Sequence, residues 1–126
     1  MVANPKRGCL RDKKYIKSFK IEGEHQCLIT GVDFPDGAHV RYGWLAAGNK
    51  PPDNYIIPLA HHLHARQHMM GEAHFWEVYN SSIPSDIWER AGDTCDVPKG
   101  GTDEEHLMAM IIQIANNYYD DWRVRG

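Results

Sequence analysis

The chain has 126 residues, a net charge of −3 and a hydrophobic content of 42%, values that suit one small globular domain and leave little room for a second. No run approaches the roughly 18 to 20 apolar residues of a membrane span, and charges occupy the N-terminal stretch where a signal peptide would be apolar. Its three cysteines are too few and too widely spaced for a disulfide framework. We therefore expect a cytoplasmic protein with reduced thiols and no membrane partner.

The charge is unevenly distributed along the chain. Seven of the fourteen Lys and Arg residues lie within residues 1–20, Lys13 and Lys14 among them, and Asp12 is the single acidic residue there. From Glu72 onward, eleven acidic residues face four basic ones. A basic arm over about residues 5–22 could contact a nucleic-acid backbone. The alternative is a charged helix that only water contacts.

The first half of the chain predicts short elements separated by turns. Residues 10–20 predict a helix with a basic outer face. Residues 27–31 and 38–44 predict two strands of a β-hairpin with a long turn over 32–37. Glycine, asparagine and two prolines then predict a loop over 46–54, from which an apolar run leads into a helix over 61–72 that ends near Gly71.

The second half is expected to be helical. Residues 73–80 continue the preceding helix or form a separate one, and residues 81–92 form another. Thr102 and Glu105 have the spacing of a capping box, which predicts a last helix that packs on the core. The aromatic residues Phe75, Trp76 and Trp88 are expected in this core. The elements together predict an α+β fold.

The histidines are clustered. Eight occur in the chain, and four of them, His61, His62, His64 and His68, fall within eight positions. On a helix that turns about 100° per residue, His61, His64 and His68 share an arc of roughly 60° opposite an apolar stripe. The spacing of His64 and His68 lets both rings reach one metal ion. The alternative is a set of solvent-facing histidines with no ligand role.

Three motifs occur in a defined order around this cluster. They are Ala-His-Val-Arg at 38–41, Asn-Lys-Pro-Pro-Asp at 49–53, and Pro-Leu-Ala followed by the histidines at 58–68. Over about residues 10–76 the pattern resembles phage and prophage HNH proteins related to the recombination enhancement nuclease of temperate phages. The resemblance implies a ββα-metal (HNH, His-Me finger) core over about 27–76. An N-terminal helix and a C-terminal helical part over about 77–126 would flank it, within one domain over 1–126.

The resemblance also implies roles for single residues. His39 resembles the general base, and either Asp53 or Asn54 resembles the middle residue of the motif, which orients the loop and the base. His64 resembles a metal ligand, with His68 as a second ligand and His61 or His62 as less certain ones.

Two basic residues flank the implied site. Arg41 and Lys50 could contact phosphate, or could be solvated.

A histidine-rich ligand set favours bound zinc, while Mg²⁺ or Mn²⁺ could serve activity. The pattern departs from the family at Ala38, where many members carry an acidic metal ligand, and at Ala60, where a cysteine is usual. These departures leave three alternatives: a ligand set of histidines, a contribution from Asp36 in the turn, or a degenerate site.

The expected function is a metal-dependent endonuclease that hydrolyses DNA, whether duplex, single-stranded or branched, in phage recombination or DNA processing. A recombinase filament is a candidate partner. One alternative is a non-catalytic, zinc-stabilised DNA-binding or recombinase-associated module. Another is a small phage interaction protein whose histidines bind nothing.

Overall fold

The computed structural model describes residues 10–42, 51–94 and 103–125. Its elements, in chain order, are α2 (Lys13–Ser18), β1 (Asp36–His39), β2 (Ile56–Leu59), α3 (His61–Met70), α4 (Glu72–Tyr79), the short 3₁₀ helix η2 (Asn80–Ser82), α5 (Ser85–Thr94) and α6 (Asp103–Arg125). The predicted α+β class is confirmed. Within the described part of the chain, no helix is long and apolar enough to cross a membrane.

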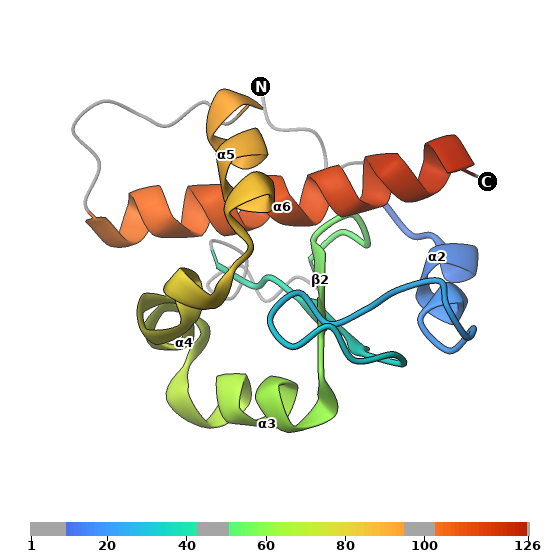
Figure 1. Cartoon of the computed structure of the whole chain (residues 1–126), viewed down its shortest axis with the longest axis horizontal. Helices are drawn as coiled ribbons and strands as arrows, with labels where there is room; N and C mark the ends of the chain where they lie inside the picture. Colours follow the sequence, from blue (N-terminus) through green and yellow to red (C-terminus); the bar gives the residue numbers. More distant parts are fainter. Residues whose placement is uncertain (1–9, 43–50, 95–102, 126) are drawn as a thin grey trace.

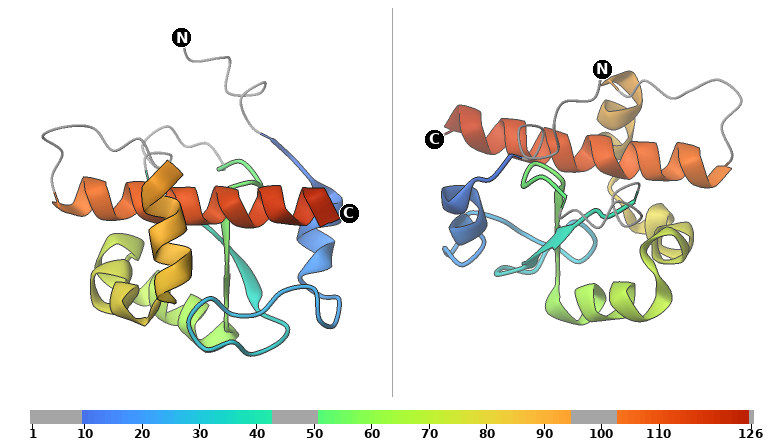
Figure 2. Two further views of the ribbon diagram at one scale, coloured as in Figure 1. Left: turned by 45° about the horizontal axis from the view of Figure 1, so that its top comes forward. Right: turned by 180° about the vertical axis from the view of Figure 1, so that it is seen from behind.

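Helix α6 runs along the whole molecule, and the two strands lie between it and helix α3 (Figure 1). Helix α5 crosses α6, while α2 lies beside the C-terminal part of α6 (Figure 2). Strand β2 contacts α6 and strand β1 contacts α3. The small sheet is therefore enclosed by helices rather than exposed on one face.

The predicted pairing of strands was wrong. Strand β1 pairs antiparallel with β2, with Asp36 opposite Leu59 and His39 opposite Ile56. Residues 27–31 instead form a turn, in which the N–H of Gly31 donates to the carbonyl of Cys27 at 2.9 Å. The reason is burial: all four residues of β2 are buried, so the apolar run that was predicted to lead into the helix is itself the strand that pairs with β1.

The N-terminal helix is shorter than the predicted 10–20. It begins at Lys13 because the carboxylate of Asp12 accepts the N–H of Tyr15 at 3.1 Å and caps the first turn. Tyr15 and Phe19 are buried as expected from their spacing, whereas Leu10 and Ile16 are each 39% exposed. The basic outer face is present, because Lys13, Lys14 and Lys17 of this helix are exposed.

The remaining helices follow the sequence pattern closely. Helix α3 ends at Met70 and α4 is a separate helix, because Gly71 between them has φ of 85°, a left-handed conformation that favours glycine. The helix predicted over 81–92 is η2 followed by α5. The predicted last helix is confirmed as α6, while Thr102 of the expected capping box lies outside the described residues.

Two apolar clusters hold these elements together. The larger joins β2, α3, α4 and α6 and contains Phe75 and Trp76, both fully buried as predicted, with Trp88 half-buried against it. The smaller joins α2 to the end of α6 through Tyr15, Phe19, Ile56 and Tyr119. Ile56 thus connects the sheet to the smaller cluster. That residues 1–126 form one domain stays a prediction.

A buried polar pair lies beneath α2. Ser18 and His25 are 2% and 5% exposed, and Oγ of Ser18 lies 2.8 Å from Nε2 of His25. The imidazole stacks on Phe19 at 4.0 Å between ring centroids. Burial and the nearby guanidinium of Arg125 lower the pKa of His25 below its ordinary value. The folded protein therefore holds a neutral imidazole here.

This burial predicts a pH dependence of stability. Because the pKa of His25 is lower in the folded chain, its contribution is fully present above the unfolded pKa of about 6.5 and is lost as the pH falls below it. His25→Asn should therefore lower the free energy of unfolding more at about pH 7.5 than at about pH 5, measured by urea denaturation. His74→Asn, an exposed control, should cost little at either pH. An equal cost of His25→Asn at both values would contradict the prediction.

Candidate functional site

His39 and Asp53 face each other at the end of the sheet where the chain leaves β1 and enters β2. His39 is the last residue of β1, opposite Ile56, and Asp53 lies three residues before Ile56. Nε2 of His39 is 3.0 Å from Oδ1 of Asp53. The Asp53 side chain is only 5% exposed and that of His39 is 16% exposed. The sheet register thus brings a buried carboxylate against a partly exposed imidazole.

The segment that precedes α2 holds Asp53 in place. Oδ2 of Asp53 accepts the N–H of Asp12 at 2.7 Å, and the Asp53 N–H donates to the carbonyl of Leu10 at 2.8 Å. The guanidinium of Arg11 lies 3.8 Å from Oδ1 and donates to the carbonyl of Pro51 at 2.8 Å. A buried carboxylate needs such partners. Neither Arg11 nor Asp12 was predicted at the site, because their contacts with Asp53 and Pro51 join segments that are far apart in the sequence.

The contact with Asp53 determines which nitrogen of His39 carries the proton. Asp53 accepts at Oδ1, so Nε2 of His39 donates and the lone pair of the neutral ring is on Nδ1. A buried carboxylate plays the same part for the histidine of hydrolase triads. In this tautomer Nδ1 is the basic nitrogen of His39.

Asn54 points elsewhere. Asp53 and Asn54 are the central residues of a turn closed by a hydrogen bond from the Tyr55 N–H to the Pro52 carbonyl at 3.0 Å. Nδ2 of Asn54 donates to Oδ1 of Asn116 on α6. Of the two residues that the sequence left open, the structure brings Asp53 to His39 and attaches Asn54 to α6.

His64 and His68 converge as their spacing predicted. Their Nε2 atoms are 3.1 Å apart, and their ring centroids are 4.8 Å apart. Two nitrogens that bind one tetrahedral zinc ion at about 2.0 to 2.1 Å lie about 3.3 Å from each other. The separation of the two Nε2 atoms, which in the structure is a hydrogen-bond contact, is therefore close to the spacing of two ligands of one zinc ion.

Asp36 supports this pair from the strand. Its Oδ2 accepts from Nδ1 of His64 at 3.0 Å and from Nδ1 of His61 at 2.8 Å. The register places Asp36 opposite Leu59, just before α3, and the first turn of that helix has no acidic residue of its own. A carboxylate there stabilises the helix N-terminus. Because Asp36 accepts a hydrogen bond from Nδ1–H of His64, the proton stays on Nδ1 and the lone pair of Nε2 can bind a metal ion.

The electrostatics of Asp36 agree with this role. Burial alone would raise the pKa of Asp36, but the hydrogen bonds from His64 and His61 outweigh it and hold this pKa below the usual value. The carboxylate is therefore charged at neutral pH.

His61, predicted as a less certain ligand, is far more exposed than His64. Its side chain is 88% exposed against 23% for His64, so its bond to Asp36 contributes little. Within residues 10–42, 51–94 and 103–125, no group of three or more histidine, cysteine or acidic side chains is arranged to hold a metal. His64 and His68 thus provide two donors, whereas a catalytic zinc ion has three protein ligands as a rule.

Two hollows meet at His39. One, of about 500 Å³, brings Asp36, His39 and His64 to one surface. The other, of about 400 Å³, shares His39 and adds Arg41 and His68. In the first hollow Gly37 permits the close packing, because a Cβ there would lie 3.2 Å from Ile56. The candidate base and both candidate ligands therefore border connected concave surfaces.

The predicted basic residues are placed unequally around these hollows. Arg41 lines the second hollow, and its backbone N–H donates to Oε2 of Glu72 at 3.0 Å. Lys13 and Lys14 are exposed on α2 but line neither hollow. Lys20, which the sequence placed only in the basic stretch, lines the first hollow. Lys50 lies outside the described residues.

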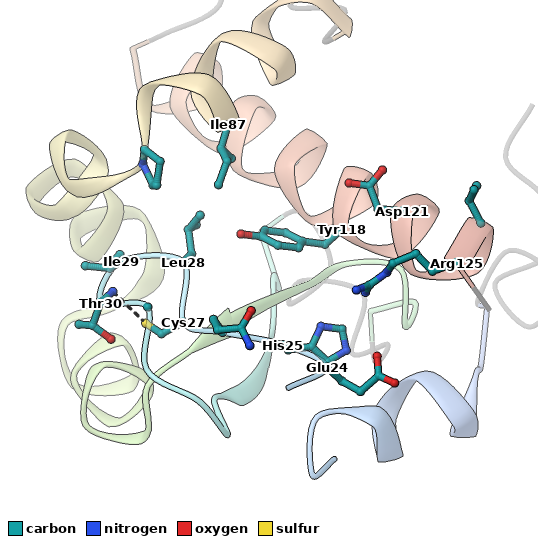
Figure 3. Close-up of a pocket in the computed structure, with 14 residues that line it drawn as sticks. Glu24, His25, Cys27, Leu28, Ile29, Thr30, Ile87, Tyr118, Asp121 and Arg125 are labelled. Carbon is teal, nitrogen blue, oxygen red and sulfur yellow. Dashed lines mark hydrogen bonds between the residues drawn. The ribbon is translucent and has the colours of Figure 1, made fainter. Parts of the chain in front are cut away.

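A separate hollow of about 840 Å³ lies between residues 24–31 and the C-terminal half of α6 (Figure 3). Cys27 borders it, with Sγ 3.4 Å from the N–H of Thr30. Burial raises the pKa of the thiol, but hydrogen bonds from Thr30 and the backbone N–H of Ala60 outweigh it and lower the pKa. Cys27 is buried as predicted, in a turn rather than a strand. No residue of the predicted site lines this hollow.

No family model, curated protein or solved structure matches this chain. The resemblance to HNH proteins therefore stays a hypothesis, which depends on the motifs and on the geometry around His39.

Asp53→Asn should reverse the tautomer of His39. The amide oxygen can still accept from the Asp12 N–H, but the amide nitrogen then faces Nε2 of His39 and donates to it. Imidazole ¹⁵N chemical shifts near neutral pH should show the proton on Nε2 in the wild type and on Nδ1 in the variant. The free energy of unfolding should fall by about 1 to 3 kcal/mol.

The matched control is Asp33→Asn, because Asp33 is an exposed acceptor for Gln26 and does not contact His39. It should leave the His39 signals unchanged. A His39 spectrum that is the same in Asp53→Asn and wild type would show that Asp53 does not orient the ring.

Proposed function

We propose that this protein is a metal-dependent endonuclease of the HNH type that hydrolyses DNA phosphodiester bonds. The observation that carries the proposal is that His39, held by Asp53, lines the same hollow as His64, whose Nε2 converges with that of His68. The order of the elements supports it, because a strand histidine, a loop carboxylate and helix histidines follow one another through β1, β2 and α3.

In this proposal His39 activates the attacking water. Nδ1 takes the proton as the water oxygen bonds to phosphorus, and the bond from phosphorus to the 3′ oxygen breaks. Asp53 retains the Nε2 proton in its hydrogen bond and stabilises the imidazolium that forms. Imidazole suits this step because its ordinary pKa is close to neutral.

His64 and His68 would hold the divalent cation, and Asp36 would orient His64 through Nδ1. When bound, the cation supplies Lewis-acid stabilisation of charge on the phosphate and on the leaving oxygen. Two imidazole ligands favour zinc or another transition metal, whereas Mg²⁺ prefers oxygen ligands.

Cationic side chains around the hollows suit a phosphate backbone. Lys20 and Arg41 border the two hollows, and Lys13 and Lys14 are exposed on α2 nearby in the sequence. A role in phage recombination, with a recombinase filament as partner, is proposed on the resemblance of the motifs.

Metal binding should depend on the helix histidines and not on His39. His64→Ala and His68→Ala should each abolish zinc binding measured by isothermal titration calorimetry, and Asp36→Asn should weaken it about 10- to 100-fold. His39→Ala should bind zinc as the wild type does, as should the control His74→Ala on α4. Loss of zinc in His39→Ala would make His39 a ligand and leave the base unassigned.

Cleavage should depend on both groups. In a supercoiled-plasmid nicking assay with Mg²⁺, Mn²⁺ or Zn²⁺, the wild type should nick and His39→Ala should lower the rate at least about 100-fold. His64→Ala and EDTA should abolish nicking, while His74→Ala should leave it unchanged. Zinc binding without nicking of duplex, single-stranded or branched DNA would instead support the binding module.

A further inference from the structure

Two side chains approach the same oxygen of Asp53. Nε2 of His39 lies 3.0 Å from Oδ1 of Asp53, and the guanidinium of Arg11 lies 3.8 Å from that atom. The other oxygen, Oδ2, accepts the backbone N–H of Asp12, a donor without a net charge. The side chain of Asp53 is 5% exposed, whereas that of Arg11 is 42% exposed. A guanidinium and an imidazole therefore share one buried carboxylate.

Backbone carbonyls hold the guanidinium at this distance. Nη1 of Arg11 donates to the carbonyl of Pro51 at 2.8 Å and to that of Leu10 at 3.1 Å, and these two bonds use both of its hydrogens. A separation of 3.8 Å is too long for a hydrogen bond to Asp53. Oδ1 therefore stays available to the N–H of His39, while the positive charge of Arg11 still acts on the carboxylate.

This positive charge opposes protonation of His39. A carboxylate beside an imidazole stabilises the imidazolium, and a protonated ring has no lone pair with which to take a proton from water. A guanidinium is always charged in proteins. Arg11 therefore offsets part of the charge of Asp53, and it also repels an imidazolium at His39 directly. Both effects favour the neutral ring.

We propose that Arg11 is a positioning residue that lowers the proton affinity of His39 and so keeps the candidate base neutral near pH 7. The inference rests on the nuclease function proposed above, because it concerns the same base. Arg11 lines neither of the two hollows at His39, so it acts through Asp53 and not by contact with a substrate there. The N-terminal segment thereby takes part in the chemistry of the site.

Other charged or titratable groups also face His39 or its partner. Those that line the two hollows come from the segments of α2, β1, α3 and α4, and they are Lys20, Asp36, Arg41, His64, His68 and Glu72. Behind Asp53 lie the carboxylate of Asp12 and the hydroxyl of Tyr119. All of these groups are the same in the wild type and in a variant of Arg11. A difference between the two proteins therefore reports the effect of Arg11.

The first test follows the titration of His39 in metal-free protein without DNA, by NMR of the imidazole nitrogens. Arg11→Gln should raise the midpoint by at least about 0.5 pH unit, which is a roughly threefold gain in proton affinity. The expected shift is small for so short a distance, because water screens the exposed guanidinium. The neutral ring should keep its proton on Nε2, since Asp53 still accepts from it.

Two further variants separate the charge of Arg11 from its contacts. Arg11→Lys keeps the positive charge and should recover at least about half of the shift. Lys14→Gln removes the same charge from an exposed residue of α2 that, in the described part of the chain, forms no ion pair with Asp53, and it should leave the midpoint unchanged. An Arg11→Gln midpoint equal to that of the wild type would overturn the proposal, and so would an equal rise in Lys14→Gln.

The second test is the pH dependence of plasmid nicking. In Arg11→Gln the acid limb of the profile should move to higher pH by the same amount as the NMR midpoint, because His39 is then protonated over a wider range. Above both midpoints the rate should stay within about twofold of the wild-type rate. A loss by the same factor at every pH would assign Arg11 to phosphate binding or to the fold, and would overturn the proposal.

The outcomes distinguish this proposal from the nuclease function. A midpoint that Arg11→Gln raises, without nicking by the wild type in any metal, would keep the effect of Arg11 on His39 and remove the endonuclease. Nicking by the wild type, with a midpoint that Arg11→Gln does not change, would keep the endonuclease and remove the role of Arg11.

Discussion

The buried carboxylate of Asp53 is the constraint on which the rest of the site depends. One oxygen faces Nε2 of His39 at 3.0 Å, and the other accepts the Asp12 N–H at 2.7 Å. Asp12 is in turn bound through its side chain by the hydroxyl of Tyr119 at 2.7 Å. This series of hydrogen bonds joins α6, the start of α2, the loop before β2 and the end of β1. Burial makes each link strong, because a lost partner would leave a charge without compensation.

The short sheet performs the other part of the positioning. Each strand has four residues, and the two ends of β1 carry Asp36 and His39. The register places Asp36 at the start of α3 and His39 beside the loop that holds Asp53. Because β2 is buried along its whole length between α6 and α3, the strands cannot shift relative to the helix histidines without disrupting the core. The same pair of strands therefore positions both the imidazole of His39 and the carboxylate of Asp36.

Helical periodicity in the sequence predicted the helices correctly, because helix formation depends on residues that are close together in the chain. The helix of the histidine cluster, the convergence of His64 with His68 and the long last helix all follow from helical periodicity, and all are present. The partner of β1 was predicted wrongly. Pairing is a long-range choice, and Pro58 within a four-residue apolar run argued against a strand there.

The positions of several site residues also depend on long-range packing, which the sequence alone did not predict. Asp53 and Asn54 are adjacent, so only the turn that separates them could show which one meets His39. The support from Asp36 was left open, because it depends on register. Arg11, Asp12 and Lys20 acquire their places from packing between distant segments, which no periodicity in the sequence reports.

Because Asp53 depends on its hydrogen bond with Asp12, the site cannot be separated from the N-terminal part of the chain. All the motif residues fall between positions 27 and 76, which suggests a segment that could be transferred to another protein. The groups that hold Asp53 in place, however, lie outside this segment. Asp12 precedes that stretch, whereas Tyr119 and the core residues Met108 and Ile111 follow it by more than thirty positions. A graft of 27–76 onto another scaffold would carry every motif residue and leave Asp53 without its support. The site therefore requires nearly the whole chain. We expect Asp12, Asp53 and Tyr119 to be kept or replaced together in evolution.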